Sequence, residues 1–375
     1  MTQSLRIGFD GTPLLGHRSG VGYYTSRLLS ALVQDNPDWE YLLYSNRPLG
    51  PLEPPLSQVQ QVARYFPRSR WVWMQTILPR TIRQSQPHLC HFTNALAPLR
   101  QPRPYILTVH DASLFVYGQY HPWARHLTIR LTLPIAVRRA AAVIAVSEHA
   151  RQELLRVLQA PAGKIHVVHE AAPNGFQPLV SPTARAALRH KYHLPDEYLL
   201  YVGTLEPRKN LSRLIRALKQ VRAAGHRHRL VLVGPQGWMM QNFRKEIAAE
   251  DMTDAVQFLG YVPTADLPGL YSLATLFVFP SLYEGFGLPP LEAMACGTPV
   301  VSSNRSSLAE ICGDAAHLVN PEDTPQIAQA LCELLEDPAR RAALGQRGLA
   351  RAKTFSWQRA AQETAAIYRQ VAAAS

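Results

Sequence analysis

The sequence predicts an α/β chain made of two Rossmann-like domains, each built on a parallel sheet. Short apolar runs alternate with helical stretches in two successive series along the 375 residues, which is the pattern of repeated βα units. A segment rich in Pro, Asn and Gly at 171–194 separates the two series and reads as a linker. A chain of this length is too long for one ordinary core and fits two domains of average size.

The apolar runs of each series predict its strands in order. The first series gives Leu5–Phe9, Tyr41–Tyr44, Leu89–Phe92, Tyr105–Val109, Val143–Val146 and Ile165–Val168, with a helix at Tyr23–Val33. The second gives Tyr198–Val202, Leu230–Val233, Val256–Leu259, Leu276–Phe279, Val300–Ser302 and His317–Val319. We therefore expect an N-terminal domain at 1–178 and a C-terminal domain at 179–357.

The composition is that of a folded protein, with 47% hydrophobic and 18% charged residues. No run of 18 apolar residues occurs, and no signal-peptide core precedes Asp10, so we expect a cytoplasmic protein. The four cysteines show no C-x-x-C spacing, which favours buried thiols over zinc ligands or disulfides. They are Cys90, Cys296, Cys312 and Cys332.

The stretch from Ser281 to Val301 carries the clearest chemical signal. Its glycines, Gly285 and Gly287, allow a tight turn, prolines 289 and 290 suit the first turn of a helix, and Gly297 ends that helix. A helix start preceded by glycines is an anion site, so a diphosphate is expected over Phe286, Gly287 and Leu288. Glu284 would face the sugar side, and Glu292 would accept hydrogen bonds from a ribose diol. The alternative is a solvated carboxylate pair beside a βα turn.

Two adjacent cations, Arg208 and Lys209, follow a strand that ends near Gly203. They are expected at the carboxyl edge of the second sheet, where ligands bind in such folds. There they would neutralise a diphosphate and offset the charge that develops on the leaving nucleoside diphosphate. The alternative is a basic surface turn. No D-x-D metal site is evident, so no metal is predicted.

Polar residues after other strands are further candidates. His110 and Asp111 follow the strand 105–109, where a neutral imidazole would bond a sugar hydroxyl and Asp111 would orient it or meet the acceptor. The loop Gly20, Val21 and Gly22, with Arg18 and Ser19 beside it, is weak evidence for a phosphate contact. Acceptor-side candidates are Asn94, Ser147 and His149, and turns at Gly234, Tyr261 and Val262 are candidates for contact with the nucleobase.

The spacing E-x7-E within E-G-F-G-L-P-x-L-E-A-M-A-x-G-x-P-V resembles the signature of retaining glycosyltransferase family four, which has the GT-B architecture. Residues 20–22, 110–111, 146–150 and 202–210 resemble the family too, in the expected order over nearly the whole chain, as do Ser302, Asn304 and Glu310. The resemblance implies donor-side roles for Glu284, His110, Arg208 and Lys209, no metal or other cofactor, and a terminal helix, 358–375, that joins the N-terminal domain.

By this resemblance we expect a hexosyltransferase that uses a nucleotide sugar and retains the anomeric configuration. GDP-mannose is the favoured donor, because residues 10–13 and 20–24 look most like mannosyltransferases that build bacterial surface polysaccharides, with a glycan or lipid-linked acceptor. UDP-glucose and dTDP-rhamnose stay open. The rival functions are a sugar-nucleotide epimerase or hydrolase on the same fold and a non-enzymatic basic lipid-binding module.

The positive charge lies mainly in the first half of the chain. Residues 1–178 hold 18 Lys and Arg against 9 Asp and Glu, whereas residues 179–375 hold 21 against 18. Cations mix with Trp71 and Trp73 in the segment 64–74 and with Leu and Ile in the segment 125–139. Such segments suit an anionic membrane surface, here the inner face of the plasma membrane, unless their apolar residues are simply core. No nucleic-acid motif accompanies the charge, so nucleic acid is not an expected partner.

Overall fold

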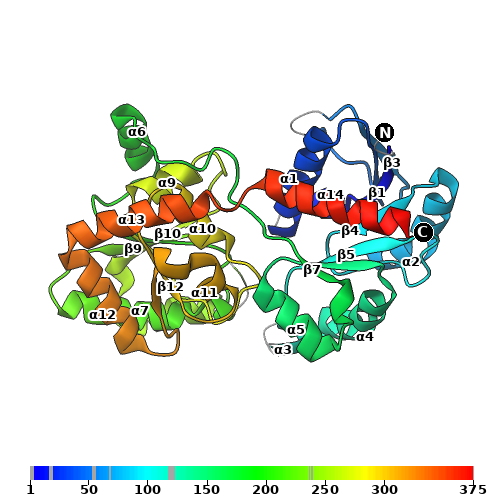
Figure 1. Ribbon diagram of the computed structural model, residues 1–375. Coiled ribbons are helices and arrows are strands. Elements are labelled where there is room, and N and C mark those ends of the chain that lie inside the picture. Colours follow the sequence, from blue (N-terminus) through cyan, green and yellow to red (C-terminus); the bar gives the residue numbers. More distant parts are fainter. Residues whose placement is uncertain are drawn as a thin grey trace. The chain divides into compact units, whose positions relative to one another are not determined.

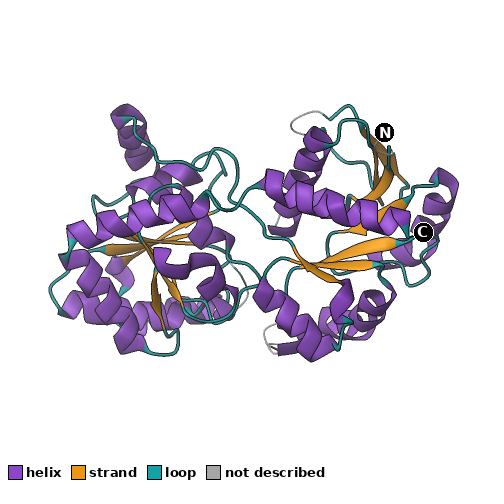
Figure 2. Ribbon diagram, viewed as in Figure 1, coloured by secondary structure: helices purple, strands orange, loops and turns teal. Residues whose placement is uncertain are grey.

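The computed structural model describes residues 4–16, 20–52, 56–66, 69–116, 123–235, 237 and 240–374. The chain divides into two compact units, Met1–Glu170 with Ser356–Ser375, and Ala171–Phe355. The sequence predicts divisions at 178/179 and 357/358, whereas the two units divide at 170/171 and 355/356. Each unit is a parallel sheet with helices on both of its faces, so the predicted α/β fold class is confirmed (Figures 1 and 2).

The first unit has a sheet in the order β3-β2-β1-β4-β5-β6-β7. Its strands are β1 (Arg6–Asp10), β2 (Glu40–Ser45), β3 (Val59–Ala63), β4 (Leu89–Phe92), β5 (Tyr105–Val109), β6 (Ala142–Ala145) and β7 (Ile165–Val167). Its helices are α1 (Gly20–Asp35), α2 (Arg70–Ser85), α3 (Ser113–Val116), α4 (Trp123–Arg139), α5 (Glu148–Leu158) and α14 (Trp357–Ala373). The closing helix α14 packs on α1, where the rings of Trp357 and Tyr24 lie 5.8 Å apart.

Three details of this unit differ from the sequence-based expectation. Strand β3, with the sequence VQQVA, lies at the sheet edge and exposes its two glutamines, so it lacks the apolar run that marked the other strands. Helix α1 begins at Gly20, which places the glycines of the expected loop inside its first turn. The side chain of Trp73 is fully buried in the core, because α2 turns it toward the sheet, so its expected membrane contact is wrong.

The second unit has a sheet in the order β10-β9-β8-β11-β12-β13. Its strands are β8 (Tyr198–Val202), β9 (Arg229–Val233), β10 (Val256–Gly260), β11 (Leu276–Phe279), β12 (Val300–Ser303) and β13 (His317–Val319). Its helices are α6 (Pro182–Tyr192), α7 (Leu211–Ala223), α8 (Met240–Ala249), α9 (Leu267–Leu273), α10 (Leu288–Ala295), α11 (Ser307–Cys312), α12 (Thr324–Glu336) and α13 (Pro338–Ala352). The strand order reverses between β8 and β11, and such a reversal is where open α/β sheets bind ligands.

The predicted linker at 171–194 is wrong in its second half, which forms helix α6. Ser181 caps this helix, and none of its residues is buried. Lys191 and Tyr192 at its C-terminal end both bond the carboxylate of Asp266, and Arg185 near its N-terminal end donates to the carbonyl oxygen of Ser272. A helix with no fully buried residue leaves only a weak apolar periodicity in the sequence, which explains why the composition indicates a linker.

The cysteines and the helices were expected to form buried thiols and no membrane span, respectively. All four cysteines are free thiols; three are buried and Cys332 is half-buried. Within the part of the chain that the structure describes, no helix has both the length and the apolar character needed to cross a membrane.

Candidate active site

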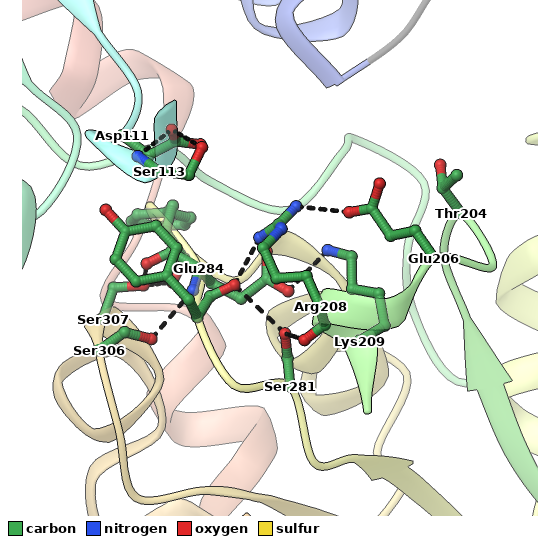
Figure 3. Close-up of polar contacts among 12 residues, drawn as sticks. Asp111, Ser113, Thr204, Glu206, Arg208, Lys209, Ser281, Glu284, Ser306 and Ser307 are labelled. Carbon is green, nitrogen blue, oxygen red and sulfur yellow. Dashed lines mark hydrogen bonds and ion pairs between the residues drawn. The ribbon is translucent and has the colours of Figure 1, made fainter. Parts of the chain in front are cut away.

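The carboxyl ends of β8 and β11 bring together three side chains that are far apart in the sequence. Arg208 and Lys209 lie in a short 3-10 turn, Pro207–Lys209, after β8, and Glu284 lies in the loop after β11. The two strands are hydrogen-bonded neighbours, so the loops that follow them emerge at the same edge. Three of the predicted donor-site residues therefore form one cluster at the point where the strand order reverses (Figure 3).

The carboxylate of Glu284 is buried between the two cations. Its Oε1 lies 2.6 Å from Nζ of Lys209, and its Oε2 lies 3.3 Å from a terminal nitrogen of Arg208. Burial raises the pKa of Glu284, but the charges of Lys209 and Arg208 outweigh that effect and hold the pKa below its usual value. The carboxylate therefore stays ionised at neutral pH and can face a developing positive charge.

Arg208 is held on two sides. One terminal nitrogen donates to the carbonyl oxygen of Tyr283 as well as to Glu284, and the other lies 2.8 Å from Oε1 of Glu206. The cluster thus contains two cations and two carboxylates and is close to neutral overall, which lowers the cost of burying it.

The turn before α10 has the predicted form. Gly287 precedes the helix with φ 112°, and a Cβ at that position would lie 2.7 Å from the side chain of Leu308. Pro289 and Pro290 occupy the first turn, and Gly297, with φ 75°, follows the helix end. Gly285 and Phe286 complete the turn, and the buried Phe286 ring packs edge-on against Phe355. The predicted helix start and stop are confirmed.

Glu292 is the fifth residue of α10. The hydroxyl of Tyr271 donates to its Oε2 at 2.9 Å. Burial and this carboxylate raise the pKa of Tyr271 well above its usual value, so the tyrosine remains the donor. The side chain of Glu292 is half-buried, and its contact with a ribose stays a prediction.

Two glycines at strand ends bring the loops of the second unit into close backbone contact. Gly203 follows β8 with φ 152°, and Gly234 follows β9 with φ 135°. A Cβ on Gly234 would lie 2.2 Å from the carbonyl oxygen of Gly203, so only glycine fits there. After β10, Val262 is buried and Tyr261 is 66% exposed. Their contact with a nucleobase stays a prediction.

His110 is held differently from the expectation. Its Nε2 lies 2.9 Å from the carbonyl oxygen of Thr93, and its Nδ1 lies 3.0 Å from Oε1 of the buried Glu170. Burial lowers the pKa of His110, but the hydrogen bond and charge of Glu170 raise it above its usual value overall. The expected neutral imidazole with a nitrogen for a sugar hydroxyl is therefore wrong in this arrangement, because both ring nitrogens already bond protein oxygens.

The remaining candidates of the first unit lie at the carboxyl ends of its strands. Asp111 accepts bonds from the backbone N–H and hydroxyl of Ser113, at 2.9 and 2.6 Å. Ser147 is fully buried and caps α5 through the N–H of Ala150, against the expected acceptor contact. His149 lies 3.9 Å from Glu153 on the same helix, and Asn94 is half-buried after β4.

The loop of Gly20, Val21 and Gly22 forms the first turn of α1 instead of a separate phosphate loop. The hydroxyl of Thr25 donates to the carbonyl oxygen of Val21 at 2.8 Å. Arg18 and Ser19 lie outside the described residues. Within the described ranges, no group of three or more His, Cys, Asp and Glu side chains is placed to hold a metal ion.

Sequence reasoning missed residues that act on the predicted ones. Glu206 lies within the motif at 202–210 but has no predicted role, and no motif marks Glu170. Ser306 and Ser307 contact the Glu284 loop and were also missed. Their position in the sequence is a signal that could have found three of them. Glu170 and the two serines each follow the carboxyl end of a strand, and the loops at these ends meet at one edge of a parallel sheet.

Comparison with known proteins places the chain in a family. A family model described as Glycosyltransferase Family 4 matches residues 18–172, and one described as Glycosyl transferases group 1 matches residues 185–351. The chain is 37% identical over 290 residues to O-antigen chain mannosyltransferase B of Escherichia coli, which covers 77% of this chain and 76% of that protein. This chain belongs to glycosyltransferase family 4.

Solved structures agree on the fold. Sucrose-phosphate synthase of Thermosynechococcus elongatus superposes with a TM-score of 0.78 at 23% identity, over 99% of this chain and 100% of that one. Anabaena HepE, solved with UDP and glucose, superposes with a TM-score of 0.76 at 20% identity, over 98% of this chain and 100% of that one. These superpositions confirm the GT-B fold that the sequence resemblance implied. The glycosyltransferase family models and the mannosyltransferase relative identify the chain as a hexosyltransferase.

Proposed function

We propose that this glycosyltransferase transfers mannose from GDP-mannose to a hydroxyl of a glycan or lipid-linked sugar, with retention of the anomeric configuration. The observation that carries the proposal is the buried cluster of Glu284, Lys209 and Arg208 at the strand-order reversal. The similarity to an O-antigen chain mannosyltransferase supports mannose as the sugar. HepE was solved with UDP and glucose, so uridine nucleotides belong in the test.

The cluster suits the departure of a nucleoside diphosphate. Lys209 has three N–H donors, of which the bond to Glu284 takes one, and a guanidinium offers a planar fork of donors. Both cations would stabilise the charge that builds on the diphosphate as the bond from its oxygen to the anomeric carbon breaks. They supply positive charge without a metal, so transfer should proceed in EDTA.

The ionised Glu284 would then act on the sugar. As the bond to the leaving oxygen breaks, the anomeric carbon becomes positive, and a fixed carboxylate stabilises it. The acceptor oxygen bonds the anomeric carbon from the same face, and its proton passes to the leaving phosphate oxygen. This scheme balances charge and atoms and retains configuration.

A donor panel tests the proposal. Thermal melts with GDP, UDP and dTDP and with their sugars, in EDTA, should show the largest rise in Tm with GDP and GDP-mannose. A glycosidic product with an added hexose mass and the donor's anomeric configuration by NMR is expected. Free mannose or an altered nucleotide sugar as the sole product would identify a hydrolase or an epimerase instead. A Tm that stays at the value of the protein alone with every nucleotide would contradict donor binding.

We also propose that the first unit docks on an anionic bilayer through the outer face of α4. This face presents Leu131, 63% exposed, and Ile135, 41% exposed, between Arg130, Arg138 and Arg139, with no acidic residue among its exposed positions from 128 to 139. Alternating arginine and aliphatic side chains match lipid phosphates and the acyl boundary. On α2, Trp71 is also partly exposed, at 40%.

Vesicle sedimentation tests the docking surface. Wild type should pellet with anionic vesicles and not with neutral ones, and pelleting should weaken as salt rises. Leu131→Gln with Ile135→Gln should reduce pelleting several-fold. The matched control is Val180→Gln, since Val180 is 84% exposed in the other unit. Equal pelleting of both variants would remove α4 as the docking surface.

A further inference from the structure

The loop that carries Glu284 is held by two serines from the neighbouring strand end. Ser306 and Ser307 lie where the connection after β12 enters α11. The hydroxyl oxygen of Ser306 accepts the backbone N–H of Glu284 at 3.0 Å. The hydroxyl of Ser307 lies 2.9 Å from the carbonyl oxygen of Glu284 and 2.7 Å from that of Phe286, and shares its proton between them.

Glu284 is therefore fixed at three places. The serines hold its N–H and its carbonyl oxygen, and Lys209 and Arg208 hold its carboxylate. Figure 3 shows these groups converging on Glu284. They lie in the segments that follow three strands, β8, β11 and β12. Ser307 is completely buried, so it acts through the loop and not by touching a ligand.

Ser306 makes its contact in a backbone conformation that suits glycine. Its φ is 55° and its ψ is −147°, a region that costs free energy for any residue with a Cβ. Glycine would adopt it without strain. The serine adds a hydroxyl, and the described contact of that hydroxyl is the N–H of Glu284. A strained backbone conformation of this kind persists only where the contacts around it hold the residue in place.

We propose that Ser306 and Ser307 are positioning residues that fix the main chain of Glu284, so that its carboxylate meets the donor sugar in the reacting geometry. The inference rests on the function proposed above. Rates depend steeply on such placement, since a displacement of about 1 Å can cost about 10²-fold. Turnover is therefore the quantity that loss of either hydroxyl changes most.

Four variants test the inference. Ser306→Ala removes the hydroxyl and keeps the strain, Ser306→Gly removes both, and Ser307→Ala removes the shared bond to two carbonyls. The matched control is Ser303→Ala, because Ser303 ends β12 just before this connection and its hydroxyl accepts the N–H of Arg305 at 3.1 Å. We would measure release of GDP from GDP-mannose, GDP binding by calorimetry, and Tm.

The expected pattern separates positioning from stability. In Ser306→Ala and Ser307→Ala, kcat at 25 °C should fall about 10- to 100-fold, with the Kd for GDP within about twofold of wild type. Ser306→Gly should lose as much turnover as Ser306→Ala yet melt about 3–6 °C higher, because its strain is relieved. Ser303→Ala should keep wild-type turnover.

Contrary results point to different failures. A purely structural role would lower Tm in Ser306→Ala and Ser307→Ala and leave kcat of the folded enzyme unchanged, which overturns the inference. Wild-type turnover in Ser306→Gly would show that Ser306 is not a positioning residue. If wild type releases nucleotide from no sugar donor of the panel, the proposed function itself fails; if it prefers another donor, the variants are compared on that donor.

Discussion

Replacing Glu284 with Gln removes one negative charge from the centre of the cluster and keeps the shape of the side chain. At an effective dielectric of about 20, a unit charge pair at roughly 4 Å is worth about 4 kcal/mol, and relief from burying the carboxylate returns part of that. Lys209 and Arg208 would lose a partner now 2.6 and 3.3 Å away. We expect a net loss of about 2 kcal/mol, or about 4–8 °C in Tm for a unit of this size.

The effect on turnover should be larger than the effect on stability. Losing one fixed electrostatic contact to the reacting centre typically lowers kcat by about 10²–10³. GDP affinity should not fall, because Lys209 no longer shares its charge with a carboxylate. Initial rates with GDP-mannose and calorimetry with GDP measure the two effects separately.

The matched control is Glu250→Gln, since Glu250 pairs with Lys219 at 2.9 Å on the surface of the same unit. An exposed pair of this kind contributes little, so its Tm and turnover should match wild type. Turnover of Glu284→Gln within about threefold of wild type would refute the role given to this carboxylate.

Three other perturbations follow from the same contacts. Arg208→Ala should slow transfer about 10²-fold or more without rescue by Mg²⁺, and loss of wild-type activity in EDTA would show that the metal-free scheme is wrong. Glu170 raises the pKa of His110 in the folded state above its usual value of about 6.5, so the pair stabilises the fold fully below that pH. This stabilisation is lost as pH rises through the pKa of His110 in the folded state. Glu170→Gln should therefore flatten the dependence of Tm on pH between about pH 6 and 9, and an unchanged dependence would contradict a stabilising role for this pair. Gly234→Ala should lower stability by about 2–4 kcal/mol in urea melts, because the new Cβ meets the Gly203 carbonyl; an unaltered midpoint would contradict that clash.

The sequence predicts most of the strands because they are short and mainly apolar runs, from Leu5–Phe9 at β1 to His317–Val319 at β13. It fails at β3 and α6, whose residues bury little and so carry no strong pattern. Trp73 shows a signal that was present and not used: with Met74, Leu78 and Ile82 it follows helical spacing and so belongs to a buried face.

The candidate site is predictable in its residue types but not in its contacts. Motifs identify Glu284, Arg208 and Lys209, since glycines, prolines and spacing surround them. Which carboxylate pairs with which cation depends on how closely the loops after β8 and β11 approach, and this is set by tertiary packing. The pairing of His110 with Glu170, 60 residues away, is likewise invisible in the sequence, and it raises the pKa of the imidazole.

Calorimetric titration of GDP into wild type and into Lys209→Ala, both in EDTA, tests the central claim most directly: the cluster after β8 and β11 is the diphosphate site of the donor. The account predicts saturable binding to wild type without metal and affinity at least about tenfold weaker in the variant, because a charge-assisted partner of the diphosphate is lost. Equal GDP affinity in the two proteins, or binding that requires added metal, would contradict it.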